Sequence, residues 1–183
     1  YDRIESGYYG PYTVDDKIYG YPEAVLTPWQ SLYVNRDIFD ACGITEDPTT
    51  VDELIATCNT IRENGYDPIA IGDKDGWPAV ILCGDYYAQQ TADYGELNKI
   101  LTGEDTFPGN EVFRNAFATV VELGQNGAYM SGFSSTDHNT AIQAFAAGQT
   151  AMLYCGSWWS SIAGGTDNGF TLDVIQLPLM EGL

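Results

Sequence analysis

A capped amphipathic helix that runs directly into an apolar strand is the feature that most constrains the fold. The segment 49–65 reads TTVDELIATCNTIRENG, in which Thr50 and Glu53 match the S/T-x-x-E capping box that begins a helix. Apolar residues recur inside it at helical spacing: Leu54, Ile55, Cys58 and Ile61. Gly65 supplies a left-handed stop, and the apolar run at 67–72 follows as a short buried strand.

Another strand precedes this helix. Residues 31–34 are predicted as a strand, and Asn35 is placed to cap a short helix that ends near Gly43. Strand, helix and strand in succession are typical of a βαβ unit, which predicts that strands 31–34 and 67–72 are parallel. We therefore expect an α/β fold, with a parallel or mixed sheet flanked by helices.

The second half of the chain continues the alternation of helices and strands. Helices are expected over 76–90, 110–127 and 135–149, and strands over 150–155 and 170–178. The predicted buried faces of the last two helices consist of Val112, Phe113, Ala116, Phe117, Val120 and Val121, and of Ala141, Ile142 and Phe145. The segment CGSWWSSIAGG then begins at the carboxyl end of strand 150–155, at the kind of sheet edge where open α/β folds bind ligands.

Charge and cysteine content exclude several classes of function. The chain has 26 acidic and 7 basic residues among 183, for a formal net charge of −19, which repels both nucleic acid and anionic lipid. No apolar run approaches the roughly 18 residues of a membrane span. The four cysteines form no C-x-x-C pair, so zinc binding and thioredoxin-like chemistry are disfavoured: Cys42, Cys58, Cys83 and Cys155. Whether these cysteines are free or form disulfides is left open.

Catalytic signatures are scarce. The single histidine, His138, is expected to be a solvated residue at a helix start, and the sequence holds no G-x-S-x-G elbow and no glycine-rich nucleotide loop. We therefore predict no catalytic residue, no metal site and no cofactor. A carboxylate pair of a carbohydrate-active hydrolase is the alternative, because acidic residues are abundant, but nothing in the sequence singles out a pair. Glu23, Asp75 and Asp85 lie near aromatic residues, and each fits a hydrogen-bond partner or a surface charge better than a tuned acid.

All four tryptophans fall at junctions between the expected elements: Trp29, Trp77, Trp158 and Trp159. A flat ring can stack on the apolar C–H face of a sugar, while neighbouring carboxylates and amides bind the hydroxyl groups. The pattern therefore favours a carbohydrate as ligand. A protein-interaction module is a third reading, and it would instead present a flat exposed aromatic patch.

Three motifs occur in an order that resembles a known family. They are DDKIYGYPEA at 15–24, the stretch from LYVNRDIF to DGWP at 32–78, and AIQAFAAGQTAMLYCGSWW at 141–159. In this order they resemble the extracellular solute-binding proteins (family 1) of carbohydrate ABC transporters, which include maltose-binding protein. The sequence departs from the family pattern at Val51, where a tryptophan is usual, and at Cys42 and Cys155.

The resemblance implies two α/β lobes that are joined by a hinge and close on a sugar. This chain would supply mainly the C-terminal lobe, over 29–176. Residues 1–28 would be the segment on the side of the N-terminal lobe with the first crossover, and 177–183 the start of the next crossover. The ending LPLMEGL is likewise typical of an excised piece, whose missing partner is the N-terminal lobe of the same protein.

Site residues carry over from the family motifs one at a time. Trp158 in GSW matches the ring that stacks on sugar, and Trp77 and Asp75 in DGWP lie where the family lines its cleft. Trp29 and Glu23 lie at the crossover, where hinge residues reach the ligand. Trp159 has no fixed counterpart in the family and is expected to pack inward.

The function that the resemblance implies is non-catalytic capture of a neutral sugar or oligosaccharide and its delivery to the membrane permease subunits of an ABC transporter. The implied location is extracellular or periplasmic, with a lipid anchor on the full-length protein. The identity of the sugar is left open.

Overall fold

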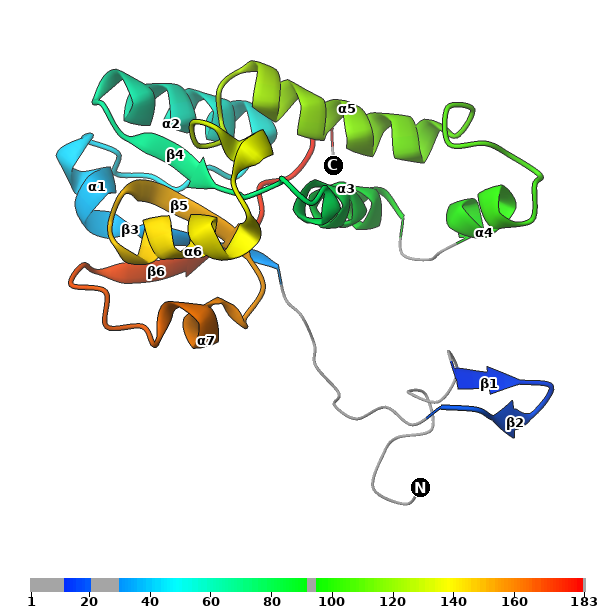
Figure 1. Ribbon diagram of the computed structural model, residues 1–183. Coiled ribbons are helices and arrows are strands. Elements are labelled where there is room, and N and C mark those ends of the chain that lie inside the picture. The colour runs from blue at the N-terminus through cyan, green and yellow to red at the C-terminus, as the bar shows by residue number, and fades with distance from the viewer. Residues whose placement is uncertain (1–11, 21–29, 92–94, 183) are drawn as a thin grey trace.

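The computed structural model describes residues 12–20, 30–91 and 95–182 (Figure 1). Its elements, in chain order, are β1 (Thr13–Val14), β2 (Lys17–Ile18), β3 (Ser31–Asn35), α1 (Arg36–Ala41), α2 (Val51–Glu63), β4 (Asp67–Ala70), α3 (Trp77–Gln90), α4 (Gly95–Leu101), α5 (Glu111–Gln125), η2 (Phe133–Ser135), α6 (His138–Ala146), β5 (Thr150–Cys155), α7 (Trp159–Ala163) and β6 (Leu172–Ile175). Strands β1 and β2 form an antiparallel pair of their own.

The main sheet has the order β4-β5-β3-β6 and is mixed. Strand β4 pairs parallel with β5, because the long connection between them carries helices α3 to α6. Strand β3 pairs antiparallel with both β5 and β6. The expected fold class, an α/β sheet flanked by helices, is confirmed.

The predicted parallel relation of strands 31–34 and 67–72 is wrong. Strand β5 lies between them, and Val34 of β3 and Ile69 of β4 both pair with Met152. Strand β3 therefore ends at the same end of the sheet at which β4 begins. The connection through α1 and α2 thus returns the chain to the end of the sheet that it left. A direct βαβ crossover would instead have carried the chain to the opposite end of the sheet, so that the two strands ran parallel.

Local capping explains where the first two helices begin. The Asn35 side chain accepts hydrogen bonds from the backbone N–H groups of Asp37 and Ile38, at 3.1 and 3.3 Å, and so caps α1. In α2, Thr50 Oγ1 accepts from the N–H of Glu53, whose carboxylate accepts in return from the N–H of Thr50. Both predicted caps are confirmed.

Apolar side chains cover both faces of the sheet. Alternate strand residues point to opposite faces, so Met152 and Tyr154 pack with α2, α3 and α5, whereas Leu153 and Cys155 pack with α6 and α7. Figure 1 shows these two helical layers on either side of the strands. The predicted inward residues of α6 are buried: Ala141, Ile142 and Phe145.

The predicted stripe of α5 is wrong at two positions. Phe117 is 63% exposed and Val121 is 39% exposed, while Thr119 and Leu123 are buried. Thr119 can turn inward because its hydroxyl donates to the backbone carbonyl of Asn115, at 3.1 Å. The buried face is therefore rotated from the one that hydrophobicity alone suggests.

All four cysteines are free, with Cys58 and Cys155 buried and Cys42 and Cys83 partly buried. Within the described ranges, no helix has the length and apolar character needed to cross a membrane.

Candidate functional site

Three side chains from the beginnings of three helices meet on the side of the sheet that α6 and α7 cover. Trp77 is the first residue of α3, His138 is the first residue of α6, and Trp158 is the N-cap of α7. The rings of Trp77 and His138 lie 4.4 Å apart between centroids, at 62° to each other. The indole Nε1–H of Trp158 donates to His138 Nε2 at 3.3 Å. We call these three residues the aromatic cluster.

The loop that carries Trp77 packs directly against the start of α6. A Cβ atom added to Gly72 would lie 2.3 Å from the backbone oxygen of Asp137, so only glycine allows this approach. Two backbone hydrogen bonds hold the loop nearby, from Asp73 N–H to the Phe133 carbonyl at 2.9 Å and from Lys74 N–H to the Thr136 carbonyl at 3.1 Å. These contacts fix the position of Trp77 relative to His138.

The two adjacent tryptophans divide into an outer and an inner ring. Trp158 is partly exposed and its ring folds over Gly156, where an added Cβ would lie 2.0 Å from ring atom Cζ3. Trp159 is 2% exposed and packs against Tyr33 and Phe145, with centroids 5.1 and 5.6 Å away. The expected inward packing of Trp159 is confirmed, and it anchors the turn that presents Trp158.

The expectation that His138 is solvated is wrong, because the side chain is only 9% exposed. Burial lowers its pKa, and the nearby Asp137 carboxylate partly opposes this effect. The neutral ring accepts from Trp158 at Nε2, which places its proton on Nδ1. The sequence held a signal for this burial, since 138, 141, 142 and 145 follow the helical spacing of the inward face of α6.

Beneath the cluster lies the thiol of Cys155. Its Sγ is 3.7 Å from His138 Nε2, and burial raises its pKa to about 12. The thiol is therefore protonated at neutral pH and is not a reactive thiolate. This Cys–His contact lacks the character of a catalytic pair.

The remaining predicted site residues are distributed differently. Asp75 is exposed in the loop just before Trp77. Trp29 and Glu23 lie outside the described residues. The structure thus brings Trp77 and Trp158 together around His138, the residue that sequence reasoning missed, and leaves Asp75 exposed on the Trp77 loop.

Asp85, the remaining acid of the hydrolase alternative, lies away from the cluster. Its carboxylate accepts from the hydroxyl of Tyr154 at 2.6 Å, and burial raises its pKa. Tyr154 and Cys155 are neighbours on β5 and point to opposite faces of the sheet. Asp85 therefore does not share a face with His138. Among the described residues, no group of three histidine, cysteine or acidic side chains could hold a metal ion.

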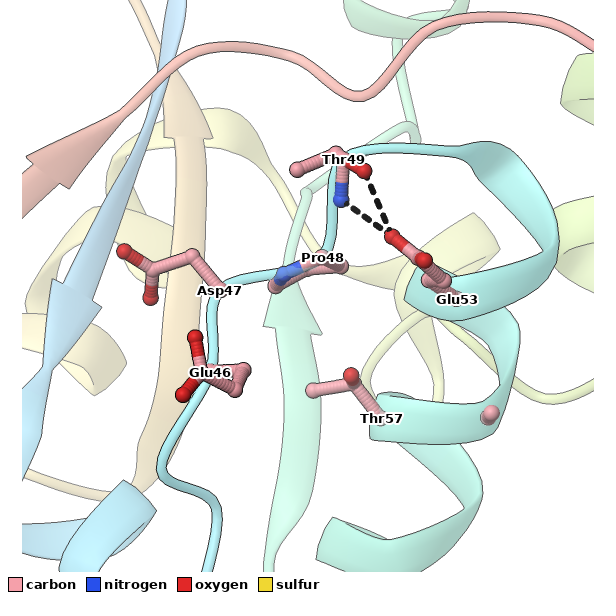
Figure 2. A pocket seen from close by; sticks show the side chains of 7 residues that line it. Glu46, Asp47, Pro48, Thr49, Glu53 and Thr57 are labelled. Atoms are coloured by element: carbon pink, nitrogen blue, oxygen red, sulfur yellow. Dashed lines mark hydrogen bonds between the residues drawn. The ribbon is translucent and has the colours of Figure 1, made fainter.

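Two hollows lie near the start of α2, and neither includes a residue of the cluster. The larger, of about 510 Å³, is lined by Glu46, Asp47, Pro48, Thr49, Glu53, Ala56 and Thr57 (Figure 2). Two of its three acids already have partners, because Glu53 accepts from Thr49 N–H and Oγ1 at 2.7 Å, and Asp47 pairs with Arg36. The other, of about 360 Å³, adjoins it along 174–179. We interpret both as surface depressions of a capped helix.

A mixed sheet covered on both faces by helices, with aromatic side chains at helix starts beyond its strands, matches one lobe of the two-lobed solute-binding proteins. Bacterial extracellular solute-binding proteins are the family to which this chain belongs, and the match spans residues 2–182.

Similar proteins agree with this assignment. A solved structure from a study of xylan utilization by Caldanaerobius polysaccharolyticus matches with a TM-score of 0.80 and 26% identity, over 99% of this chain and 46% of that one. A chitin oligosaccharide binding protein matches with a TM-score of 0.75 and 26% identity, over 93% of this chain and 42% of that one. An uncharacterized ABC transporter extracellular-binding protein of Pyrococcus horikoshii is 41% identical over 51 residues, which are 26% of this chain and 11% of that protein. The chain thus spans less than half the length of these relatives.

Proposed function

We propose that this chain forms one wall of a sugar-binding cleft in the substrate-binding component of an ABC importer. The observation that carries the proposal is the aromatic cluster, in which Trp77 and Trp158 are held partly exposed around a buried His138. The rings lie after the carboxyl ends of β4 and β5, which is the edge where open α/β sheets bind ligands.

The chemistry of the cluster suits a neutral sugar. An indole face offers apolar surface to the C–H face of a pyranose, and polar neighbours bind the hydroxyl groups. The net charge of −19 disfavours an anionic ligand. Names among the similar structures point to xylan and chitin oligosaccharides, so oligosaccharides of these two kinds are the first candidates.

The rest of the cleft belongs to the proposal as well. We assign residues 29–176 to the C-terminal lobe, 1–28 to the segment on the side of the N-terminal lobe with the first crossover, and 177–183 to the start of the next crossover. The opposite wall belongs to the N-terminal lobe of the same protein. Asp75, Trp29 and Glu23 would add polar and aromatic contacts to the sugar. Closure of the lobes would trap the ligand for delivery to membrane permease subunits, outside the cell and from a lipid-anchored protein.

The test is a thermal-shift screen of the full-length protein against neutral mono- and oligosaccharides, including xylotriose and triacetylchitotriose. Binding to the folded state raises the melting temperature as ligand concentration rises. Glucuronic acid is the anionic control and should give no shift. Absence of a shift with every neutral sugar would contradict the proposal.

The same samples distinguish capture from hydrolysis. A binding protein returns the oligosaccharide intact after prolonged incubation, whereas a hydrolase releases shorter sugars that chromatography detects. Because Asp85 lies across the sheet from His138 and accepts a hydrogen bond from Tyr154, we expect no release. Release that Asp85→Asn abolishes would favour the hydrolase.

A further inference from the structure

We propose that His138 is the positioning residue of this site, whose Nε2 holds the Trp158 indole in the orientation that stacks on the sugar. The inference rests on the proposed function and extends it, since it assigns a role to a residue that does not itself touch the ligand. It depends on one hydrogen bond, one ring contact and the burial of the imidazole.

The hydrogen bond supplies the only donor of the indole with an acceptor. Tryptophan has a single polar atom, Nε1–H, and a partly buried indole needs a partner for it. In Trp158 that partner is His138 Nε2, at 3.3 Å. A bond at this corner of the ring adds to the close packing of the ring on Gly156 and restricts rotation about the side-chain torsions.

His138 also contacts the second ring of the cluster. Its centroid lies 4.4 Å from that of Trp77, in an edge arrangement. The imidazole therefore touches both partly exposed tryptophans, which come from α3 and from the start of α7. This one side chain therefore sets the position of the two rings relative to each other.

The imidazole is itself held firmly. It is 9% exposed, with the Cys155 thiol 3.7 Å below Nε2. The start of its helix is fixed by the Asp137 side chain, which accepts from Thr140 N–H at 3.0 Å, and by the close backbone approach of Gly72. A rigid acceptor is what a positioning residue requires.

The hold depends on the protonation state of the imidazole. His138 Nε2 accepts a hydrogen bond only when it carries no proton. In a protonated ring, the Nε2–H of His138 would point at the Nε1–H of Trp158. The groups around it are the Cys155 thiol from β5 and the Asp137 carboxylate at its own helix cap, and Lys74 from the Trp77 loop interacts with that carboxylate. Trp77 and Trp158 add no charge. Burial lowers the His138 pKa, so the ring is neutral at pH 7 and only acidification through this lowered pKa releases Trp158.

The first test needs no ligand. In full-length protein with ¹⁵N-labelled indoles, the Trp158 resonance is assigned by its loss in Trp158→Phe and followed from pH 7.5 to 4.5. We expect a shift with a midpoint below 6.5 that is absent in His138→Gln. His138→Leu should move the resonance at pH 7.5, whereas the exposed neighbour Asn139→Leu should not. A Trp158 resonance that is indifferent to both pH and His138→Leu overturns the inference.

The second test measures affinity at pH 7.5 for xylotriose and triacetylchitotriose. Loss of one hydrogen bond predicts about three- to tenfold weaker binding for His138→Leu. His138→Gln, whose amide oxygen can accept from the indole, should recover most of it, and Asn139→Leu should match wild type. Unchanged affinity in His138→Leu overturns the inference. Failure of every variant and of wild type to bind sugar, with the indole response intact, overturns the proposed function but supports the contact.

Discussion

Gly72→Ala tests the backbone packing on which the whole site depends. The ideal Cβ at this position lies 2.3 Å from the backbone oxygen of Asp137, whereas ordinary van der Waals contacts begin at 3.4 Å. The loop after β4 and the start of α6 must therefore separate by about 1 Å, because both contacting groups are backbone and neither can rotate away.

The cost follows from what that separation breaks. The backbone hydrogen bonds that Asp73 and Lys74 donate are 2.9 and 3.1 Å long and adjoin the contact, so a shift of about 1 Å takes them out of range. Overpacking costs about 1–3 kcal/mol and each lost hydrogen bond about 0.5–1.5 kcal/mol. We expect Gly72→Ala to lower the free energy of unfolding by about 2–6 kcal/mol.

The assay is urea denaturation of the full-length protein, followed by tryptophan fluorescence. Gly84→Ala is the matched control, because Gly84 lies within α3 and an added Cβ would meet nothing within 4 Å. Alanine is favoured over glycine inside a helix, so the control should be more stable than wild type by about 0.5–1 kcal/mol. Stability of Gly72→Ala within about 0.5 kcal/mol of wild type, below the smallest overpacking cost, would refute the reasoning.

Three further predictions concern the same lobe. Asn35→Ala removes the cap of α1 and should cost about 1 kcal/mol in urea denaturation; unchanged stability would contradict the capping role. Phe145→Ala empties a fully buried position beside Trp159 and should cost about 3–5 kcal/mol, while Phe117→Ala, on an exposed face, should cost less than about 1 kcal/mol. Because burial lowers the pKa of His138 in the folded state, the unfolded chain binds the proton more readily. The contribution of neutral His138 to stability is therefore complete above about pH 6.5 and declines as the pH falls toward the folded-state pKa. His138→Gln should remove this part of the pH dependence of stability.

Local signals in the sequence predicted the elements well. The capping box of Thr50 and Glu53, the Asn35 cap and the position of the tryptophan pair beyond strand 150–155 are all confirmed. Each of these features depends on residues within a few positions of one another, where capping and periodicity act directly.

Long-range relations were harder to predict. The predicted direction of strands 31–34 and 67–72 was wrong because β5, which follows β4 by about 80 residues, inserts between β3 and β4. No local pattern encodes that insertion. The predicted buried face of α5 was wrong because the Thr119 hydroxyl donates a hydrogen bond to the helix backbone, which allows this polar residue to be buried. His138 was missed because its partners, Trp77 and Trp158, are brought to it by the tertiary fold alone.

The most direct test of the central claim is a tryptophan-fluorescence titration of the full-length protein with xylotriose and triacetylchitotriose. The account predicts a saturable change for at least one of them, and binding weakened at least about tenfold in Trp158→Ala, as for a buried aromatic contact. Phe117→Ala, an exposed aromatic on a helix that covers the other face of the sheet, should bind as wild type does. A sugar that binds with equal affinity to wild type and to folded Trp158→Ala would contradict the account.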